Sequence, residues 1–332
     1  MMKKKFISAA ILAALLLTGC ANNSVSSDIS GSSQTSVSST ESTSSSEESE
    51  YVSGSRDDNG VYVVDGYAAK LEYPLSEKNI NYAAKRFAYI NEQFLSGKCD
   101  NIYVTVVPDK NYFLAKENGY PALDYGELAE MLTKQMDYAK YIDIYPMLEL
   151  SDYYRTDTHW KQEKIFDIAQ FIAEKMGVSL SSDYSQTELE GDFFGVHCRQ
   201  AEISIEPDKL VYLTNDILRE CKVFDGETSS YIDVYNLELA SGKDPYEIFL
   251  SGAKSLLTIE NPNATTDKEL LIFRDSFASS IAPLFAEGYA KITLIDIRYL
   301  APQLLSNFVK FNGQDVLFLY SAPVLNNSVT FK

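Results

Sequence analysis

The amino-acid sequence predicts an α/β fold with a mainly parallel sheet, and three observations support this. Segments of strand and helix character alternate near the C-terminus, over residues 269–320. Residues 102–107 form a nearly continuous β-branched and aromatic run, typical of a strand covered on both faces. Residues 77–96 and 161–176 carry apolar side chains at helical spacing. Alternating strands and helices imply parallel strands with right-handed crossovers and helices on both faces.

The predicted elements fall into an early group and a late group. The early group consists of helices at 77–96, 125–139 and 161–176 with strands at 101–107 and 141–144. The late group consists of strands at 269–273, 291–297 and 315–320 with helices at 277–287 and 301–311. The less periodic residues between them predict an inserted smaller lobe at 178–255, with short strands at 209–214 and 231–234.

Composition limits the classes of function. The 332 residues are 45% hydrophobic, which is enough for a substantial core. The net charge of −18 argues against nucleic acid as a partner, because phosphate binding requires clustered Lys and Arg. Two histidines and four cysteines are too few for a zinc module. We therefore predict no metal site and no cofactor.

The N-terminus predicts export. Three lysines at positions 3–5 precede an apolar run over 6–17, which is typical of a signal peptide and too short for a membrane span. The following Leu17-Thr18-Gly19-Cys20 resembles the lipobox of bacterial lipoproteins, in which cleavage leaves the cysteine lipidated. We expect Cys20 to anchor an extracytoplasmic protein to the bacterial cell membrane. The alternative is an ordinary cleaved signal peptide with a chance cysteine.

The organisation that follows has three parts. Residues 1–19 are the predicted signal peptide. Residues 20–56 are rich in Ser and almost devoid of apolar side chains, so we predict a lipidated cysteine followed by a disordered tether. Residues 57–332 are the predicted folded domain. Within it, Cys198 and Cys221 could form a disulfide after export or remain buried free thiols, and Cys99 would be unpaired.

A serine follows the predicted strand at 269–273. Ser276 lies at a strand-to-helix turn, which places its hydroxyl at the carboxyl edge of the sheet, where ligands bind in parallel α/β folds. Backbone N–H groups and the helix dipole could stabilise an oxyanion there. The alternative is that Ser276 only caps the helix.

A second cluster precedes the predicted helix at 161–176. Asp157 lies two residues before His159, and in a turn its carboxylate can reach the imidazole and fix its tautomer. The sole tryptophan, Trp160, follows directly. The alternative is that Asp157 or Thr158 only caps the following helix and that His159 has no role. His197 is a rival base, but it has no adjacent acid.

Taken together, the two clusters resemble a known family. An Asp-x-His-Trp motif before a helix, with Asp-Ser-Phe after a later strand, is similar to the DHHW-type and alginate-acetylation proteins of the SGNH-hydrolase-like superfamily. The likeness spans residues 76–328. Further matching segments are Val107-Pro108-Asp109-Lys110, Tyr153-Tyr154-Arg155-Thr156, Gly191-Asp192-Phe193-Phe194-Gly195, Ala282-Pro283-Leu284, Asp296-Ile297-Arg298-Tyr299 and Leu325-Asn326-Asn327-Ser328.

The resemblance implies a three-layer SGNH-hydrolase-like fold and a triad of Ser276, His159 and Asp157. In active members, the serine accepts an acetyl group and passes it to a polysaccharide hydroxyl, often beside a membrane-bound O-acyltransferase. The partners implied here are therefore a polysaccharide substrate, a possible membrane-bound O-acyltransferase and, through Cys20, the membrane.

The sequence departs from the family pattern at several positions. Arg274 replaces the small residue before Asp-Ser, where it could crowd the turn or bind an anionic group. Thr158 replaces the second histidine of a literal Asp-His-His-Trp. Asn326 or Asn327 is the nearest candidate for an oxyanion donor. The candidate substrate contacts are Arg274, Trp160, Asn326 and Tyr154.

Three functions remain open. The leading interpretation is an O-acetyltransferase or acetylesterase that acts on a cell-surface or extracellular polysaccharide. The first alternative is a non-catalytic glycan-binding or scaffold lipoprotein of an acetylation or export complex, and Arg274 is the residue that favours it. The second is a substrate-binding lipoprotein of a transporter, which would have a cleft between two similar lobes.

Overall fold

The computed structural model describes residues 59–180, 183–201 and 203–332. The predicted signal peptide, the lipidation site Cys20 and the tether lie outside the described residues. None of the helices within these ranges combines the length and the hydropathy that a membrane span requires.

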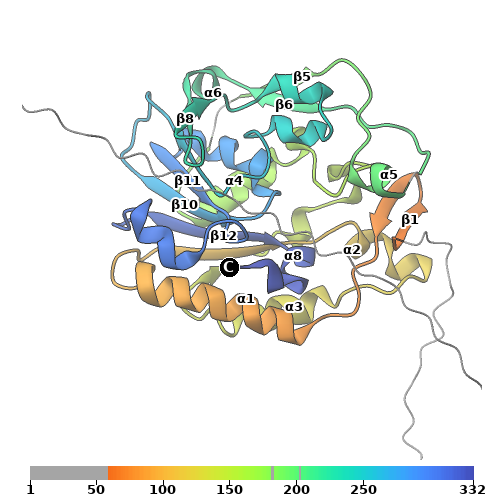
Figure 1. Ribbon diagram of the computed structural model, residues 1–332, viewed down its shortest axis with the longest axis horizontal. Helices are drawn as coiled ribbons and strands as arrows, with labels where there is room; N and C mark the ends of the chain where they lie inside the picture. Colours follow the sequence, from red (N-terminus) through yellow and green to blue (C-terminus); the bar gives the residue numbers. More distant parts are fainter. Residues whose placement is uncertain (1–58, 181–182, 202) are drawn as a thin grey trace, which may run out of the picture. The chain divides into compact units, whose positions relative to one another are not determined.

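An eight-stranded sheet forms the centre of the fold, and its five strands from β4 to β11 run parallel (Figure 1). The remaining three strands extend it in antiparallel fashion. This confirms the predicted α/β class with a mainly parallel sheet. In spatial order the strands are β4 (Lys140–Tyr141), β3 (Ile102–Val107), β12 (Asp315–Ser321), β10 (Glu269–Arg274), β11 (Lys291–Ile295), β9 (Leu256–Glu260), β7 (Lys222–Asp225) and β8 (Ser230–Ile232).

Side chains of the central strands alternate between two hydrophobic cores, one on each face of the sheet. In β10, Leu270 and Ile272 belong to one core, whereas Leu271 and Phe273 belong to the other. Every residue of β3 and β12 is buried, as expected for strands covered on both faces.

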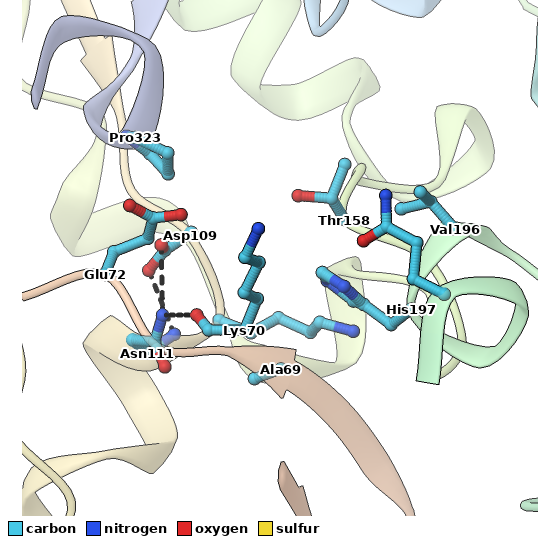
Figure 2. Close-up of a pocket in the computed structure, with 11 residues that line it drawn as sticks. Ala69, Lys70, Glu72, Asp109, Asn111, Thr158, Val196, His197 and Pro323 are labelled. Atoms are coloured by element: carbon cyan, nitrogen blue, oxygen red, sulfur yellow. Dashed lines mark hydrogen bonds between the residues drawn. The ribbon is translucent and has the colours of Figure 1, made fainter. Parts of the chain in front are cut away.

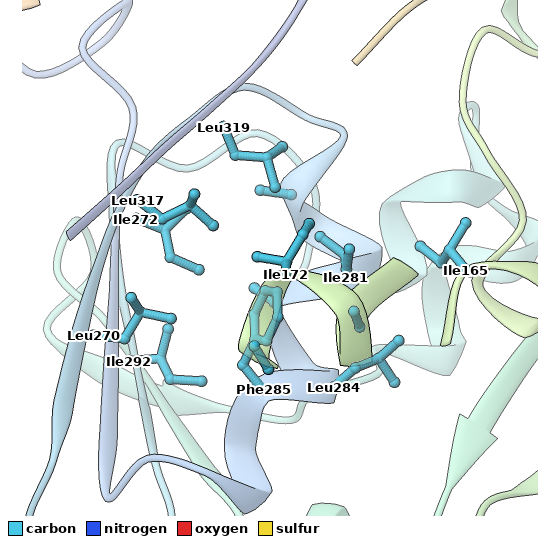
Figure 3. Close-up of a cluster of buried hydrophobic side chains, with 14 of the residues drawn as sticks. Ile165, Ile172, Leu270, Ile272, Ile281, Leu284, Phe285, Ile292, Leu317 and Leu319 are labelled. Atoms are coloured by element: carbon cyan, nitrogen blue, oxygen red, sulfur yellow. The ribbon is translucent and has the colours of Figure 1, made fainter. Parts of the chain in front are cut away.

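Helices complete the predicted three layers. α1 (Glu77–Ile90) and α3 (Tyr125–Thr133) cover one face, and α4 (Phe166–Lys175) and α7 (Ala278–Ile281) cover the other (Figure 1). Figure 3 shows the second of these interfaces, where Ile172 of α4 and the neighbouring Phe285 face the side chains of the strands.

The helices are shorter than the sequence predicts. The predicted helix at 77–96 is α1 followed by a π-helical turn, Asn91–Leu95. The predicted helix at 277–287 is α7 followed by a 3-10 segment, Ala282–Glu287, because Pro283 lacks the N–H that an α-helix needs at that point. Other differences are α3, which ends at Thr133, a 3-10 turn at Gln162–Lys164 before α4, and a 3-10 helix at Pro302–Asn307 in place of the helix at 301–311.

The region predicted as an inserted lobe divides between two sheets. β5 (Ser185–Glu188) and β6 (Val211–Thr214) form a separate antiparallel pair. β7 and β8 instead extend the central sheet. The helices of this region are α5 (Val196–Ala201) and α6 (Asp216–Glu220).

An N-terminal hairpin, which the sequence analysis did not predict, packs beside the segment that contains Asp157. The hairpin consists of β1 (Val61–Val64) and β2 (Tyr67–Lys70). The backbone N–H of Ala68 donates to the carbonyl of Arg155 over 2.8 Å. The hairpin therefore contributes to the same edge of the fold as the candidate catalytic residues.

Three neighbouring strands end at that edge, and each continues into a short helix. β3 leads to α2 (Asn111–Leu114), β12 leads to α8 (Ala322–Asn326) and β10 leads to α7. Ligands of parallel α/β folds bind beyond the carboxyl ends of the strands, so this edge is where a site is expected.

Substitution of Phe318 measures how much the hydrophobic core contributes to the free energy of unfolding. Its ring lies 4.8 Å from that of Phe273 and 4.9 Å from that of Phe87, and it is fully buried. We expect Phe318→Ala to lower the free energy of unfolding by about 3–5 kcal/mol because it opens a cavity in the core. The matched control is Phe308→Ala, at a side chain that is 56% exposed. Chemical denaturation should show a change within about 0.5 kcal/mol for the control, and equal effects of the two substitutions would contradict the prediction.

Candidate active site

Ser276 stands directly beyond the carboxyl end of β10, as the sequence predicts. Its neighbour Asp275 fixes the turn: Oδ1 accepts the backbone N–H of Phe277 at 3.0 Å, and Oδ2 accepts both the N–H and the hydroxyl of Ser321 at 2.7 Å. The buried carboxylate thereby ties the end of β10 to the end of β12. Because α7 has only four residues, the dipole of a long helix is not available to the serine.

Ser276, His159 and Asp157 form a continuous chain of hydrogen bonds. Ser276 Oγ lies 2.8 Å from His159 Nε2, and His159 Nδ1 lies 2.6 Å from Asp157 Oδ2. The serine and the histidine are 117 positions apart in the sequence. These contacts match the geometry of a catalytic triad, in which the carboxylate orients the imidazole and the imidazole takes the serine proton.

Asp157 is buried, and its environment favours the ionised form. Burial alone would raise its pKa, but the charge and hydrogen bond of His159, together with the N–H of Val196 at 2.7 Å, outweigh burial and hold the pKa well below its usual range. The carboxylate is therefore charged at any pH at which His159 acts as a base.

The loop that contains Asp157 is held on two sides. Tyr153 and Trp160 form an isolated antiparallel bridge that closes the loop. Asp208 accepts the N–H of Thr156 at 2.8 Å, and the amine of Lys110 donates to the carbonyl of Tyr154 at 2.8 Å. Burial lowers the pKa of Lys110 to about 7, although Asp157 and Asp208 oppose this shift.

Tyr246, from the predicted lobe, lies flat against the imidazole of His159. The two ring centroids are 3.8 Å apart and the planes are inclined by 3°. The Tyr246 hydroxyl donates to Ser280 Oγ at 3.0 Å, so the ring is fixed relative to α7. The sequence analysis missed this residue, because no local motif links Tyr246 to a histidine so far away along the chain.

Gly195 is also part of the site. A Cβ atom at this position would lie 2.1 Å from Asp157 Cβ and 2.4 Å from Asp157 Cα, which no side chain can tolerate. The Gly-Asp-Phe-Phe-Gly segment noted in the sequence thus ends in a glycine that lets the backbone approach Asp157 closely.

Trp160 was predicted as a substrate contact, and the structure corrects this. Its side chain is fully buried, and its indole N–H donates to the Phe277 carbonyl at 3.1 Å and to Ser280 Oγ at 2.9 Å. The indole therefore links the residue after His159 to the residues after Ser276, and it holds the two parts of the triad in register.

Arg274 is likewise not exposed to a substrate. Its guanidinium is fully buried and donates to Ser279 Oγ at 2.8 Å and to the Lys254 carbonyl at 3.1 Å. Burial lowers its pKa, although nearby Asp296 opposes this. The predicted role in binding is wrong, because the side chain turns into the protein and crosslinks two loops.

Tyr154 and Asn326 are corrected for similar reasons. Tyr154 is fully buried in a small core, edge-on to Phe193 and to Tyr246. The Asn326 side chain supports the start of α1 instead of an oxyanion: its Oδ1 accepts the N–H of Ser76 at 2.7 Å, and its Nδ2 donates to the carbonyl of Pro74 at 3.1 Å.

The rival base His197 and the three described cysteines are all buried. His197 is buried, and burial together with the charge of Lys110 lowers its pKa to about 3, so the base that contacts Ser276 is His159. Cys198, Cys221 and Cys99 are buried free thiols, so the first two do not form the disulfide considered above. Within the described ranges, no group of three or more His, Cys, Asp or Glu side chains is placed to hold a metal ion.

Comparison with solved structures identifies the fold. A DHHW family protein from Eubacterium siraeum matches with a TM-score of 0.68 at 21% identity, covering 83% of this chain and 95% of the other. The chain shares its SGNH-like fold. Bacillus cereus PatB1 with a sulfonyl adduct matches with a TM-score of 0.62 at 19% identity, over 82% of this chain and 97% of PatB1. No protein-family model and no curated protein sequence matches. The resemblance drawn from the motifs is therefore confirmed for the fold.

Gly195→Ala is expected to displace Asp157 and disturb its hydrogen bond to His159, because the added Cβ would overlap the backbone of Asp157. A shift of about 1 Å in a catalytic group can cost about 100-fold in rate. The rate at which a fluorophosphonate labels Ser276 should fall by about that factor. The control is Gly126→Ala in α3, where the added Cβ meets only Asp124 Oδ1, at 3.4 Å. Similar labelling rates for both variants would show that the contact with Asp157 is unimportant.

The lowered pKa of Asp157 also predicts a dependence of stability on pH. The unfolded carboxyl titrates near about 3.9, above its folded pKa, so its contribution is fully present above about pH 5 and is lost as the pH falls toward the folded value. The deficit in unfolding free energy of Asp157→Asn at pH 7 should therefore shrink below about pH 4. Denaturation at several pH values measures this. Asp216→Asn, at an exposed carboxyl, should follow the unmodified protein, and a constant deficit for Asp157→Asn would contradict the argument.

Proposed function

We propose that the protein is a lipid-anchored, extracytoplasmic serine enzyme that moves O-acetyl groups onto or off a polysaccharide. The observation that carries the proposal is the unbroken chain from Ser276 through His159 to Asp157, with contacts of 2.8 and 2.6 Å. Three side chains in this arrangement serve acyl transfer in unrelated folds. The fold shared with the DHHW family protein is compatible with such a site.

The first half of the proposed reaction acetylates the serine. Ser276 Oγ attacks the carbonyl carbon of an acetyl ester while His159 Nε2 accepts its proton. As the tetrahedral intermediate collapses, the bond to the leaving alcohol breaks and His159 returns the proton to that oxygen. Asp157 stabilises the imidazolium between the two steps.

The negative oxygen of the intermediate needs a hydrogen-bond donor, worth about 3 kcal/mol. We assign the backbone N–H of Ser276, which has no acceptor among the described residues. The side-chain amide N–H of Asn326, the donor considered from the sequence, bonds instead to the carbonyl of Pro74.

In the second half, water or a sugar hydroxyl attacks the acetyl-enzyme, which distinguishes an esterase from a transferase. A polysaccharide acceptor agrees with the predicted position of the domain outside the membrane, held by lipidated Cys20. A membrane-bound O-acyltransferase is the partner that we propose as the source of acetyl groups.

The alternative of a non-catalytic glycan-binding or scaffold lipoprotein depended on Arg274 crowding the turn. Its guanidinium points into the protein, and the contact between Ser276 and His159 forms beside it. The transporter alternative calls for two similar lobes, whereas the described residues share one central sheet.

Intact-mass analysis tests the proposal directly. The full-length protein is incubated with an aryl acetate, and we expect one added acetyl group that Ser276→Ala lacks. Asp157→Asn should acetylate about 10⁴-fold more slowly, because the imidazole loses its orienting carboxylate. Ser151→Ala, at an exposed hydroxyl, is the control and should behave as the unmodified protein. An adduct that persists in Ser276→Ala, or its absence from the unmodified protein, would overturn the proposal.

A further inference from the structure

A cavity of about 200 Å³ opens at the edge of the sheet that holds the triad (Figure 2). Glu72, Asp109 and Pro323 lie along one side of it, and Thr158 and His197 lie on the opposite side. Lys70, from β2 of the hairpin, lies between them. The cavity is thus built from the segments that follow β3 and β12, the loop 153–160, α5 and the N-terminal hairpin.

The cavity is adjacent to the catalytic residues. Thr158, which lines it, stands between Asp157 and His159 in the chain, and Val196, which also lines it, donates its N–H to Asp157. Pro323 follows β12, the strand next to the one that carries Ser276.

Several polar groups in the cavity have no partner within the described part of the chain. Within the described residues, neither the exposed Lys70 amine nor the half-buried Glu72 carboxyl has a hydrogen bond or ion pair, although Glu72 feels the charge of Lys70. His197 Nδ1 is buried without a hydrogen-bond partner. A buried polar atom without a partner costs free energy, so a polar ligand that bonds to His197 Nδ1 would remove that cost.

The other charged groups in the cavity are already engaged. The Lys110 amine donates to the carbonyls of Tyr154 and Arg155. The Asp109 carboxylate accepts hydrogen bonds from Asn111 and from the hydroxyl of Tyr125. A ligand would therefore be recognised chiefly by Lys70, Glu72 and His197.

We propose that this cavity is the acceptor site, and that it binds one uncharged sugar ring through its hydroxyl groups, with Lys70 as donor and Glu72 as acceptor. This inference rests on the proposed function. The volume is below the range of about 300–1,000 Å³ that holds drug-sized ligands, so it suits a single ring. An acidic sugar would pair with Lys70 but would bring its carboxylate close to the carboxyl groups of Glu72 and Asp109. Burial and the charge of Asp109 raise the pKa of Glu72 to about 7 against the opposing charge of Lys70, so a further negative charge there would favour the protonated form of Glu72.

The transfer step balances with the residues present. The acceptor hydroxyl oxygen attacks the carbonyl of acetyl-Ser276, and its proton passes to His159. The bond to Ser276 Oγ then breaks, and the same proton returns to that oxygen. The products are the acetylated sugar and the free enzyme.

The test follows loss of the acetyl-enzyme with two matched probes, methyl glucoside and methyl glucuronide, which differ by one carboxylate. The full-length protein is first acetylated with an aryl acetate, and the acetylated sugar is then detected by mass. We expect methyl glucoside to be the better acceptor. Lys70→Met and Glu72→Gln should each raise its half-saturating concentration about tenfold, because the first removes a charged donor and the second replaces a carboxyl acceptor by a weaker amide acceptor. Lys70→Arg keeps a charged donor, so its half-saturating concentration should lie close to that of the unmodified protein.

The controls are Lys85→Met and Glu92→Gln, two exposed positions in the α1 region, which should match the unmodified protein. Three outcomes would overturn the acceptor site. They are faster transfer to methyl glucuronide than to methyl glucoside, equal half-saturating concentrations for all variants, and no acceleration of acetyl-enzyme loss by either sugar. Failure of the unmodified protein to form an acetyl-enzyme would instead overturn the proposed function, so the two failures are distinguishable.

Discussion

The candidate active site depends on how the backbone of residues 153–160 is held. Asp208 accepts the N–H groups of Arg155 and Thr156 from one side, and Lys110 donates to the carbonyls of Tyr154 and Arg155 from the other. Each of these backbone groups would cost free energy if it were buried without a partner. The loop therefore has little freedom to rearrange. These backbone contacts position Asp157 beside His159. The hydrogen bond between the two side chains therefore does not have to hold the loop in place.

A second set of buried polar contacts fixes the nucleophile. Asp275 joins the turn after β10 to Ser321 at the end of β12, and Arg274 joins the same turn to the Lys254 loop. Buried charges are costly unless they are paired or hydrogen-bonded, so the hydrogen bonds that these two residues make favour one conformation of the turn. The indole N–H of Trp160 donates to the Phe277 carbonyl and so links this turn to the loop 153–160. Arg274, which from the sequence could have disabled the site, is one of the residues that position it.

The sequence was sufficient to predict the parallel core and to select Ser276, His159 and Asp157, which the structure places within hydrogen-bond distance, because both depend on local patterns. Burial on two faces makes a strand continuously apolar, and short motifs place Ser276 and the Asp-x-His pair at strand and helix boundaries. The roles of Trp160, Tyr154 and Asn326 could not be predicted, because a polar or aromatic side chain next to a motif can point inward or outward. The hairpin and the antiparallel strands β5, β7 and β9 were not predicted either, since short strands contain too few residues to show a period.

Different parts of the fold supply the residues for the two halves of the proposed reaction. The nucleophile and its base depend on the central strands and on loops locked by buried hydrogen bonds. The cavity beside them takes Lys70 and Glu72 from the N-terminal hairpin and the segment after it, whose own core is small. Because those side chains bond to nothing else in the described chain, they can be exchanged without loss of a structural contact. In the proposed reaction, substitutions at Lys70 and Glu72 can therefore change the preference for an acceptor with little effect on acetylation of Ser276.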